Sequence, residues 1–446
     1  MKLIQTIKNI WKIDDLRKRL TITFLFVLVY RLGCHVVMPG IDPAALEAMR
    51  RFTSSSGLMQ LLDMFSGGAF SQASIFALGI MPYITASIVI QLLGMVLPQF
   101  QKMQREGESG RMKLNQYTRY LTVFILLFQG PAYVLNLQYQ VNAAGQPMQI
   151  GFWNLAFLTI VLTAGAMFIM WLGEKITDKG IGNGISIIIL VGIIARFPSA
   201  VVQEFTNRLN TAQGGLVMFL VEVIILFAVT AGAVMLVQGT RKVPVQYAKR
   251  IVGNKQYGGA RQYIPLKVNA ANVMPIIFAQ ALMFIPITLS GFGARSEGAG
   301  FWASFARTFS DMDGFWYNLV YFLMILAFTY FYTAITVRPT QMAEEMKKNS
   351  GFIPGVKPGK KTAEYLDSIM SRITLPGSIF LGIVAIMPAF ARLFGVNQQF
   401  AQFFGGTSLL ITVGVVLDTL QQIETHLMMH HYDGLMKSGK VRGRTH

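Results

Sequence analysis

Histidines are the side chains here most suited to metal or acid–base chemistry, and their spacing offers little of either. His426 and His430 are four residues apart, so one face of a helix would present both rings to a metal ion. His35 stands alone, and the remaining two lie in the same polar C-terminal region: His431 and His446. An intramembrane hydrolase needs a nucleophile with a base, or a set of metal ligands. We favour a polar tail over a metal site and predict no catalytic residue, metal or cofactor.

Ionisable residues inside apolar stretches are the next candidates, because ion-coupled transport places such groups at membrane depth. Only Arg31, Glu222 and Asp418 qualify, and each is predicted near the end of its stretch. A secondary transporter is the alternative, and it requires Asp418 or Glu222 at mid-membrane with a charged partner. The glycines of "GIGNG" (180–184) lack dinucleotide spacing, and no GxxxxGK[ST] loop occurs. Energy from a nucleotide must therefore come from a partner.

The elements that position these residues are membrane helices. Of 446 residues, 53% are hydrophobic and 13% charged, whereas soluble domains carry about 25% charged residues. The net charge is nonetheless +18. Cys34 is the only cysteine, so no intrachain disulfide is possible. The first apolar stretch has no small-residue cleavage site after it and is predicted to be a retained span.

Long apolar runs predict ten membrane spans. They lie near 20–38, 74–97, 119–137, 152–172, 183–201, 216–237, 270–290, 315–336, 374–393 and 405–424. Prolines interrupt three of them, which is consistent with a cavity that is not filled by lipid; ordinary kinking of membrane helices is the alternative. These prolines are Pro82, Pro275, Pro286, Pro376 and Pro388.

Lysine and arginine set the predicted orientation. Alternate connecting segments, including both termini, hold 31 of the 39 basic residues, and seven lie in or beside the other five loops. Positive charge stays cytoplasmic, so both termini are predicted to be cytoplasmic. Ten spans divide into an N-terminal half (1–212) and a C-terminal half (213–446) that start on opposite sides. This arrangement is that expected of an inverted repeat, which places a pathway at the interface of its halves.

A half-length apolar segment precedes the second span. "LLDMFSGGAF" (61–70) is too short to cross a membrane, which takes about 20 residues. Its residues alone favour an amphipathic helix on the membrane surface. Gly67 and Gly68 are expected to make its connection to the second span flexible.

Long motifs identify a family resemblance. "MFSGGAFSQASIFALGIMPYITASIVIQLL" (64–93) and "MWLGEKITDKGIGNGISIII" (170–189) resemble the SecY family, the central subunits of the bacterial Sec protein-translocation channel. "REGESGRMKLNQYTRY" (105–120), "TAEYLD" (362–367) and "FFGGTSLL" (403–410) follow in the family's order, with "YAKR", "PLKVN" and "YTA" between them. The match runs from about residue 14 to about residue 436.

The resemblance implies an hourglass pore between the halves, with a short plug helix (about 58–72) on its outer side. A ring of apolar side chains would close the pore, and a β-branched collar is stiff and gates by dewetting. The implied ring consists of Ile80, Ile84, Ile185, Ile189, Ile277 and Ile411. The implied plug includes Leu61, Leu62, Met64, Phe65, Ser66, Gly67 and Gly68. The segment at 61–70 then becomes a removable stopper instead of a surface helix.

Polar residues within apolar spans match the family's lateral gate, where a channel opens sideways into lipid. They are Gln91, Asn183, Gln280 and Thr407. Interhelical hydrogen bonds of roughly 0.6 to 2 kcal/mol can hold two helices together yet release them. Hydrogen bonding between helices with no gating role is the alternative for each residue.

Two long cytoplasmic loops carry much of the basic charge. Residues 241–267 alternate like two strands around a Gly253-Asn254 turn, and residues 344–372 predict helix, turn, helix. The resemblance implies docking of a ribosome or the SecA motor ATPase through Arg241, Lys242, Lys249, Arg250, Lys255, Lys357, Lys360 and Lys361. Membrane topology alone explains the charge but not the length of these loops (about 238–269 and 337–373). Lys357 and Asn254 depart from common family patterns, which bears on the details of docking.

The predicted fold class is thus an all-α polytopic membrane protein of the cytoplasmic (inner) membrane. The predicted function is a protein-conducting channel, not an enzyme, that translocates unfolded polypeptides and releases apolar segments laterally into lipid. The resemblance implies SecE-like and SecG-like membrane subunits as partners, together with signal sequences, unfolded substrates and the lipid bilayer.

Overall fold

The computed structural model describes ten stretches of the chain: residues 13–41, 63–143, 150–210, 215–247, 250–252, 255–257, 261–271, 273–280, 282–283 and 314–437. The chain divides into two compact units. Unit 1 comprises Met1–Ser199 and Val415–His446, and unit 2 comprises Ala200–Gly414. This boundary lies close to the predicted division at 212/213, but the C-terminal segment joins unit 1. The inverted-repeat relation of the halves stays a prediction.

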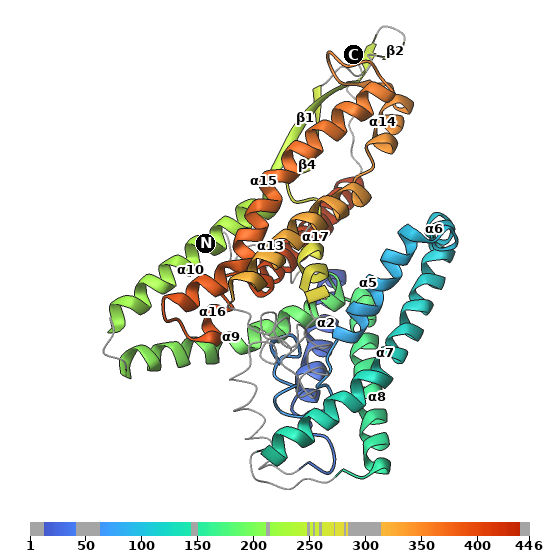
Figure 1. The fold of residues 1–446 in the computed structure, drawn as a ribbon. Coiled ribbons are helices and arrows are strands. Elements are labelled where there is room, and N and C mark those ends of the chain that lie inside the picture. The colour runs from blue at the N-terminus through green and yellow to red at the C-terminus, as the bar shows by residue number, and fades with distance from the viewer. Residues whose placement is uncertain are drawn as a thin grey trace. The chain divides into compact units, whose positions relative to one another are not determined.

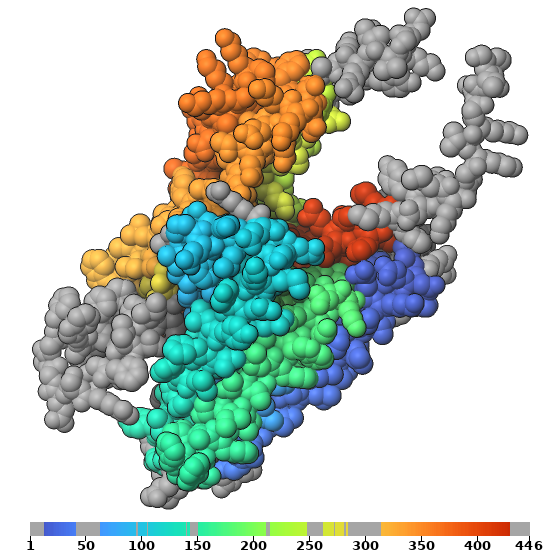
Figure 2. Space-filling view, turned by 90° about the vertical axis from the view of Figure 1, so that its right-hand side faces the viewer, coloured from blue at the N-terminus to red at the C-terminus, as the bar shows by residue number. Residues whose placement is uncertain are grey.

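Unit 1 is a bundle of helices. It contains α2 (Asp14–Gly33), α5 (Met81–Val96), α6 (Pro98–Arg105), α7 (Glu108–Ala143), α8 (Phe152–Lys179), and most of both α9 (Gly184–Asn210) and α17 (Gly406–Lys437). In Figure 2, α2, α8 and α7 run side by side across one face of this unit. Each of these helices overlaps a predicted span or its flank.

The second predicted span, 74–97, begins later than expected. Residues 66–80 form turns, and α5 starts only at Met81. Pro82 therefore lies in the first turn of α5, where its missing N–H removes no helical hydrogen bond. The expectation that Pro82 kinks the interior of a span is wrong. Pro376 and Pro388 do lie inside α15 (Lys360–Leu393), as expected.

Unit 2 combines membrane helices with a small sheet. Its long helices are α10 (Gly215–Gln238), α13 (Phe315–Thr336) and α15, and the short α16 (Gln398–Ala401) precedes α17. Residues 274–280 are helical and belong to the seventh predicted span. Pro275 lies at the start of that helix, and Pro286, in the remainder of the predicted span, lies outside the described residues.

The two long loops of unit 2 form one folded body. β1 (Thr240–Tyr247) pairs antiparallel with β4 (Arg261–Lys267) from its own loop and with β5 (Gly351–Phe352) from the other. The predicted hairpin and the predicted helix–turn–helix are confirmed, the latter as α14 (Pro339–Lys348) followed by α15. β2 (Arg250–Val252) and β3 (Lys255–Tyr257) extend the hairpin. Figure 1 shows α14 and α15 beside β1 and β4, and we call this body the head.

Apolar residues from both loops hold the head together. The buried cluster contains Val243, Val245, Leu266, Met346, Ile353, Leu366 and Met370. On β1, Val243 and Val245 are buried while Lys242 and Pro244 are exposed. This alternation is what a strand with one covered face requires.

The described residues hold seven helices that are long and apolar enough to cross a membrane, or eight if the bent pair α5–α6 counts as one span. Charged residues in its first two turns keep α2 outside this set. The all-α polytopic fold class is confirmed.

Candidate functional site

Residues 63–80 form a buried turn segment in unit 1. Asp63–Phe65 make one helical turn, and every residue from 63 to 70 is buried. An amphipathic helix on a membrane surface would leave one face exposed, so that alternative is wrong for these residues. The expected helix over 61–70 is also wrong for 66–70, because Gly67 and Gly68 adopt positive φ angles. Leu61 and Leu62 lie outside the described residues.

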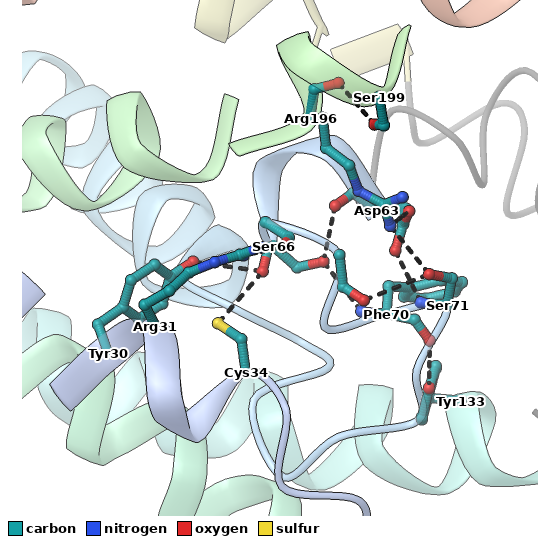
Figure 3. Close-up of polar contacts among 12 residues, drawn as sticks. Tyr30, Arg31, Cys34, Asp63, Ser66, Phe70, Ser71, Tyr133, Arg196 and Ser199 are labelled. Atoms are coloured by element: carbon teal, nitrogen blue, oxygen red, sulfur yellow. Dashed lines mark hydrogen bonds and ion pairs between the residues drawn. The ribbon is translucent and has the colours of Figure 1, made fainter. Parts of the chain in front are cut away.

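An ion pair fixes the start of the segment. The Asp63 carboxylate contacts the guanidinium of Arg196, which lies on α9. Its Oδ1 also accepts a hydrogen bond from the Ser71 backbone N–H at 2.7 Å. Arg196 donates in turn to Ser71 Oγ at 2.9 Å. One carboxylate thereby closes a loop of the segment and attaches it to α9 (Figure 3).

Side chains of helix α2 contact the same segment from another direction. Arg31 donates to the Gly67 carbonyl at 2.5 Å, and Tyr30 Oη donates to the Ser66 carbonyl at 3.3 Å. The Cys34 thiol lies 3.7 Å from the same Ser66 oxygen. Figure 3 shows these three side chains reaching the segment on the side away from Arg196. The charge of Arg31 is therefore bound to a backbone carbonyl within unit 1.

Gly67 and Gly68 are required for this close approach. A Cβ on Gly67 would meet the Gly192 Cα of α9 at 3.1 Å, and one on Gly68 would lie 2.9 Å from the Arg196 guanidinium. Their φ angles of 66° and 94° are also strained for other residues. We expected these glycines to provide flexibility, which stays a prediction; the structure shows that they enable tight packing.

The end of the segment packs on an apolar core. Phe70, Ala73 and Ala77 join a buried cluster with residues of α7 and α8, including Tyr133 and Leu162. Tyr133 Oη also donates to the Phe70 carbonyl at 2.9 Å. The segment is therefore held by side chains of α2, α7, α8 and α9 together.

The six isoleucines predicted to form a ring fall in both units. In unit 1, Ile80 caps the start of α5 and Ile84 lies one turn later, while Ile185 and Ile189 are one turn apart on α9. In unit 2 are Ile277, in the helix 274–280, and Ile411 on α17. Ile80, Ile189 and Ile411 are buried, and the other three are partly exposed. A Cβ on Gly173 of α8 would meet Ile185 at 3.1 Å, so Ile185 packs toward α8.

Two of the four predicted gate residues make hydrogen bonds within or next to their own helix. Asn183 is exposed, and its Oδ1 accepts hydrogen bonds from the N–H groups of Ile185 and Ser186 at 3.1 and 3.4 Å. Asn183 is thus the N-cap of α9, a role that "NGIS" at a helix start could have indicated. Gln91 Nε2 lies 3.4 Å from Ser87 Oγ on the same helix. Gln280 and Thr407 are buried.

The predicted docking residues belong to the head. Arg241, Lys242, Lys357, Lys360 and Lys361 are exposed. Arg250 and Lys255 lie on the paired strands β2 and β3, and Lys249 lies outside the described residues. Sequence reasoning treated the two loops separately and missed that β5 joins them.

A second buried charge cluster accounts for Glu222. Arg208 on α9 contacts Glu204 Oε1 at 2.9 Å and Glu222 Oε1 at 2.5 Å, and all three are buried. Glu204 Oε2 accepts from the Asn397 N–H at 2.9 Å. Arg208 is two residues from the end of α9, and Glu222 is seven residues into α10, about 10 Å along the helix. The cluster joins the C-terminal end of α9 to the first third of α10. Glu222 is thus buried with a charged partner nearer one end of α10 than its middle, and Asp418 is exposed.

In the part of the chain that the structure describes, no three His, Cys, Asp or Glu side chains come together as a metal site would require. His426 lies on α17, whereas the side chains of His430, His431 and His446 lie outside the described residues. His35 Nδ1 lies 2.9 Å from the Arg31 carbonyl at the end of α2.

Comparisons with known proteins agree with this architecture. A family model described as SecY matches residues 74–420. "Protein translocase subunit SecY" of Streptomyces galbus is 43% identical over 436 residues, covering 96% of this chain and 98% of that protein. The Mycobacterium bovis protein of the same name is 41% identical, covering 95% and 97%.

Two solved structures share the fold at lower identity. One, described as "The structure of a protein conducting channel", has a TM-score of 0.63 at 18% identity and covers 92% of each chain. The other is described by the statement that the plug domain of SecY stabilises the closed state of the translocation channel and maintains a membrane seal. It has a TM-score of 0.64 at 19% identity and also covers 92% of each chain.

Proposed function

The chain belongs to the SecY family of protein translocase subunits, and from this premise we propose that it conducts unfolded polypeptides across the cytoplasmic membrane and releases apolar segments sideways into lipid. The observation that carries the proposal is the buried turn segment at 63–80. It is too short and too irregular to span a membrane, yet it is buried among spanning helices. Non-helical backbone at membrane depth is tolerated only where protein or a wet cavity surrounds it.

Residues 61–70, with Leu61, Leu62, Met64, Phe65, Ser66, Gly67 and Gly68, act as the plug of this channel. Hydrogen bonds and one ion pair hold the segment to α2 and α9. Such contacts are reversible, and a segment that crosses no membrane can leave its place without removing a spanning helix. A segment held in this way is suited to moving aside for a translocating chain.

The six isoleucines form the second layer of closure. Ile80, Ile84, Ile185 and Ile189 come from α5 and α9, and Ile277 and Ile411 come from unit 2. An apolar, β-branched collar resists wetting around an extended chain. Gln91, Asn183, Gln280 and Thr407 line the lateral gate, with Asn183 also capping α9.

The head is the docking surface for cytoplasmic partners. Its exposed basic residues suit the phosphates of ribosomal RNA or the acidic groups of the SecA motor. Both termini and the head lie on the cytoplasmic side of the inner membrane, as the basic residues predict. SecE-like and SecG-like membrane subunits complete the complex, and signal sequences and unfolded polypeptides are its substrates.

Single-channel recording from purified complexes in planar bilayers, without motor or substrate, tests the plug and ring. Deleting 61–70 should leave an inserted protein whose resting pore leaks ions intermittently. Replacing Ile84 and Ile189 with Ser should also cause leakage, because small polar groups widen and wet the collar. The combined variant should leak more than either. Equal, near-zero conductance in the wild type and all three variants would mean that the pore lies elsewhere.

A further inference from the structure

We propose that Asp63 and Arg196 form an ionic latch that keeps the plug seated, with Arg196 as a positioning residue on α9. The inference rests on the proposed plug role of residues 61–70. Within the described residues, this is the one ion pair that joins the segment to a helix. It links residues 133 positions apart in sequence, so it fixes the position of the plug relative to α9 instead of stabilising a local turn.

Burial gives the pair its strength. The Asp63 side chain is 7% exposed and that of Arg196 is 29% exposed, so the carboxylate has little access to water while the plug is seated. Both Asp63 oxygens have protein partners, Arg196 and the Ser71 N–H. The guanidinium also bonds Ser71 Oγ, so the two ends of one loop are fixed to a single side chain.

The same pair releases readily once water enters. Charges attract strongly in a dry environment and weakly in water, and each regains its hydration on release. A latch of this chemistry fixes the position of the plug without making displacement prohibitive. Removing one charge leaves the other buried and unpaired, whereas removing both leaves neutral amides of similar shape.

Cys34 provides a native reporter of plug seating. It is the only cysteine, it is 1% exposed, and its thiol lies against the Ser66 carbonyl of the plug. Displacement of the plug uncovers this thiol. The rate of Cys34 modification by a water-soluble maleimide in the purified complex therefore measures how often the plug leaves its seat.

The variants Asp63→Asn and Arg196→Gln should each raise this rate by roughly ten-fold or more, because an unpaired buried charge disfavours the seated state. The double neutral variant should still be modified faster than the wild type, because no ion pair holds the plug. Its rate should be lower than the product of the single effects predicts, because no unpaired buried charge remains. Exchanging the charges, Asp63→Arg with Arg196→Asp, should give slower modification than either reversal alone. Arg119→Gln removes an ion pair between α7 and α8 and should leave the rate unchanged.

Deletion of 61–70 separates this inference from the plug role itself. If the deletion accelerates Cys34 modification and causes ion leakage but the single variants behave as wild type, the plug exists and the latch does not. If the deletion changes neither, the plug role is wrong. If the single variants insert poorly, the double neutral variant decides: a wild-type rate there overturns the latch, and a faster rate supports it.

Discussion

Gly68 shows how a single hydrogen side chain determines the packing of the turn segment proposed as the plug. Its φ of 94° excludes most other residues, and the Arg196 guanidinium fills the space that a Cβ would need. Gly40 has a similar φ of 85° but nothing lies within 4 Å of the position of its Cβ. Both glycines have a backbone that strains other residues, but only Gly68 has a neighbour at its Cβ position. Gly40 is therefore a suitable control for Gly68.

Replacing Gly68 with Ala should therefore unseat the plug, while Gly40→Ala should only add backbone strain. Both changes should cost about 1 to 2 kcal/mol for the left-handed backbone. Gly68→Ala also displaces Arg196, so only this variant should accelerate maleimide modification of Cys34. Equal rates in the two alanine variants would contradict the close-approach explanation.

The cluster of Glu204, Arg208 and Glu222 is a second place where individual residues decide stability. Arg208 is the shared cation of two buried carboxylates and donates a hydrogen bond to each. Arg208→Met should lower the free energy of unfolding by about 3 to 5 kcal/mol, because both carboxylates would be left buried without a cation. Thermal denaturation of the purified complex measures this loss.

Glu174→Gln is the control for that prediction. It removes the partner of Arg119 in a more exposed pair, which should cost only about 0.2 to 1 kcal/mol. Combining Arg208→Met with Glu204→Gln and Glu222→Gln should recover much of the loss, since no uncompensated charge remains. A triple variant as unstable as Arg208→Met would show that packing, not charge, holds the two helices.

At the scale of elements, the head depends on contacts that join distant segments. β1 and β4 come from one loop, while β5, α14 and the start of α15 come from another. Because Val245 and Leu366 share one buried cluster, the basic residues of both loops are presented by a single folded body. Changing the surface charge of the head is therefore expected to abolish docking while the head stays folded.

Reversing Arg250 and Lys357 to Glu should weaken motor-dependent export while abundance and insertion stay normal. Lys357 is exposed, and exposed charges contribute little to stability. Export of a precursor into inverted membrane vesicles measures the effect. Lys179→Glu is the matched control, an exposed basic residue at the end of α8 with the same predicted sidedness. Normal export by the double reversal would argue against docking through the head.

At the scale of the whole molecule, the distribution of basic residues predicts one topology. With 31 of 39 basic residues on one set of alternate segments, cysteines at positions 255 and 357 should react only from the cytoplasmic side. A cysteine at 213 should react only from the outside. The measurement is membrane-impermeant labelling of intact cells in a variant lacking Cys34, and external labelling of position 255 or 357 would refute the topology.

The sequence by itself determined the fold class, the order of the helices and the secondary structure of the head. Apolar runs of about 20 residues have few alternatives to a spanning helix, and strand alternation is a local property. The sequence motifs also located the segment at 61–70 and identified the family. These features depend on neighbouring residues, so they can be read without knowing what packs against them.

Only the tertiary structure decided what holds that segment in place. Asp63 meets Arg196, Arg31 meets the Gly67 carbonyl, and Tyr133 meets Phe70 across 133, 36 and 63 positions of sequence. No local pattern encodes such pairs, because burial and partner choice depend on which helices lie side by side. The same holds for the Arg208 cluster and for β5. An isolated charge in an apolar run predicts that its burial costs free energy. Only the folded chain shows which partner offsets that cost.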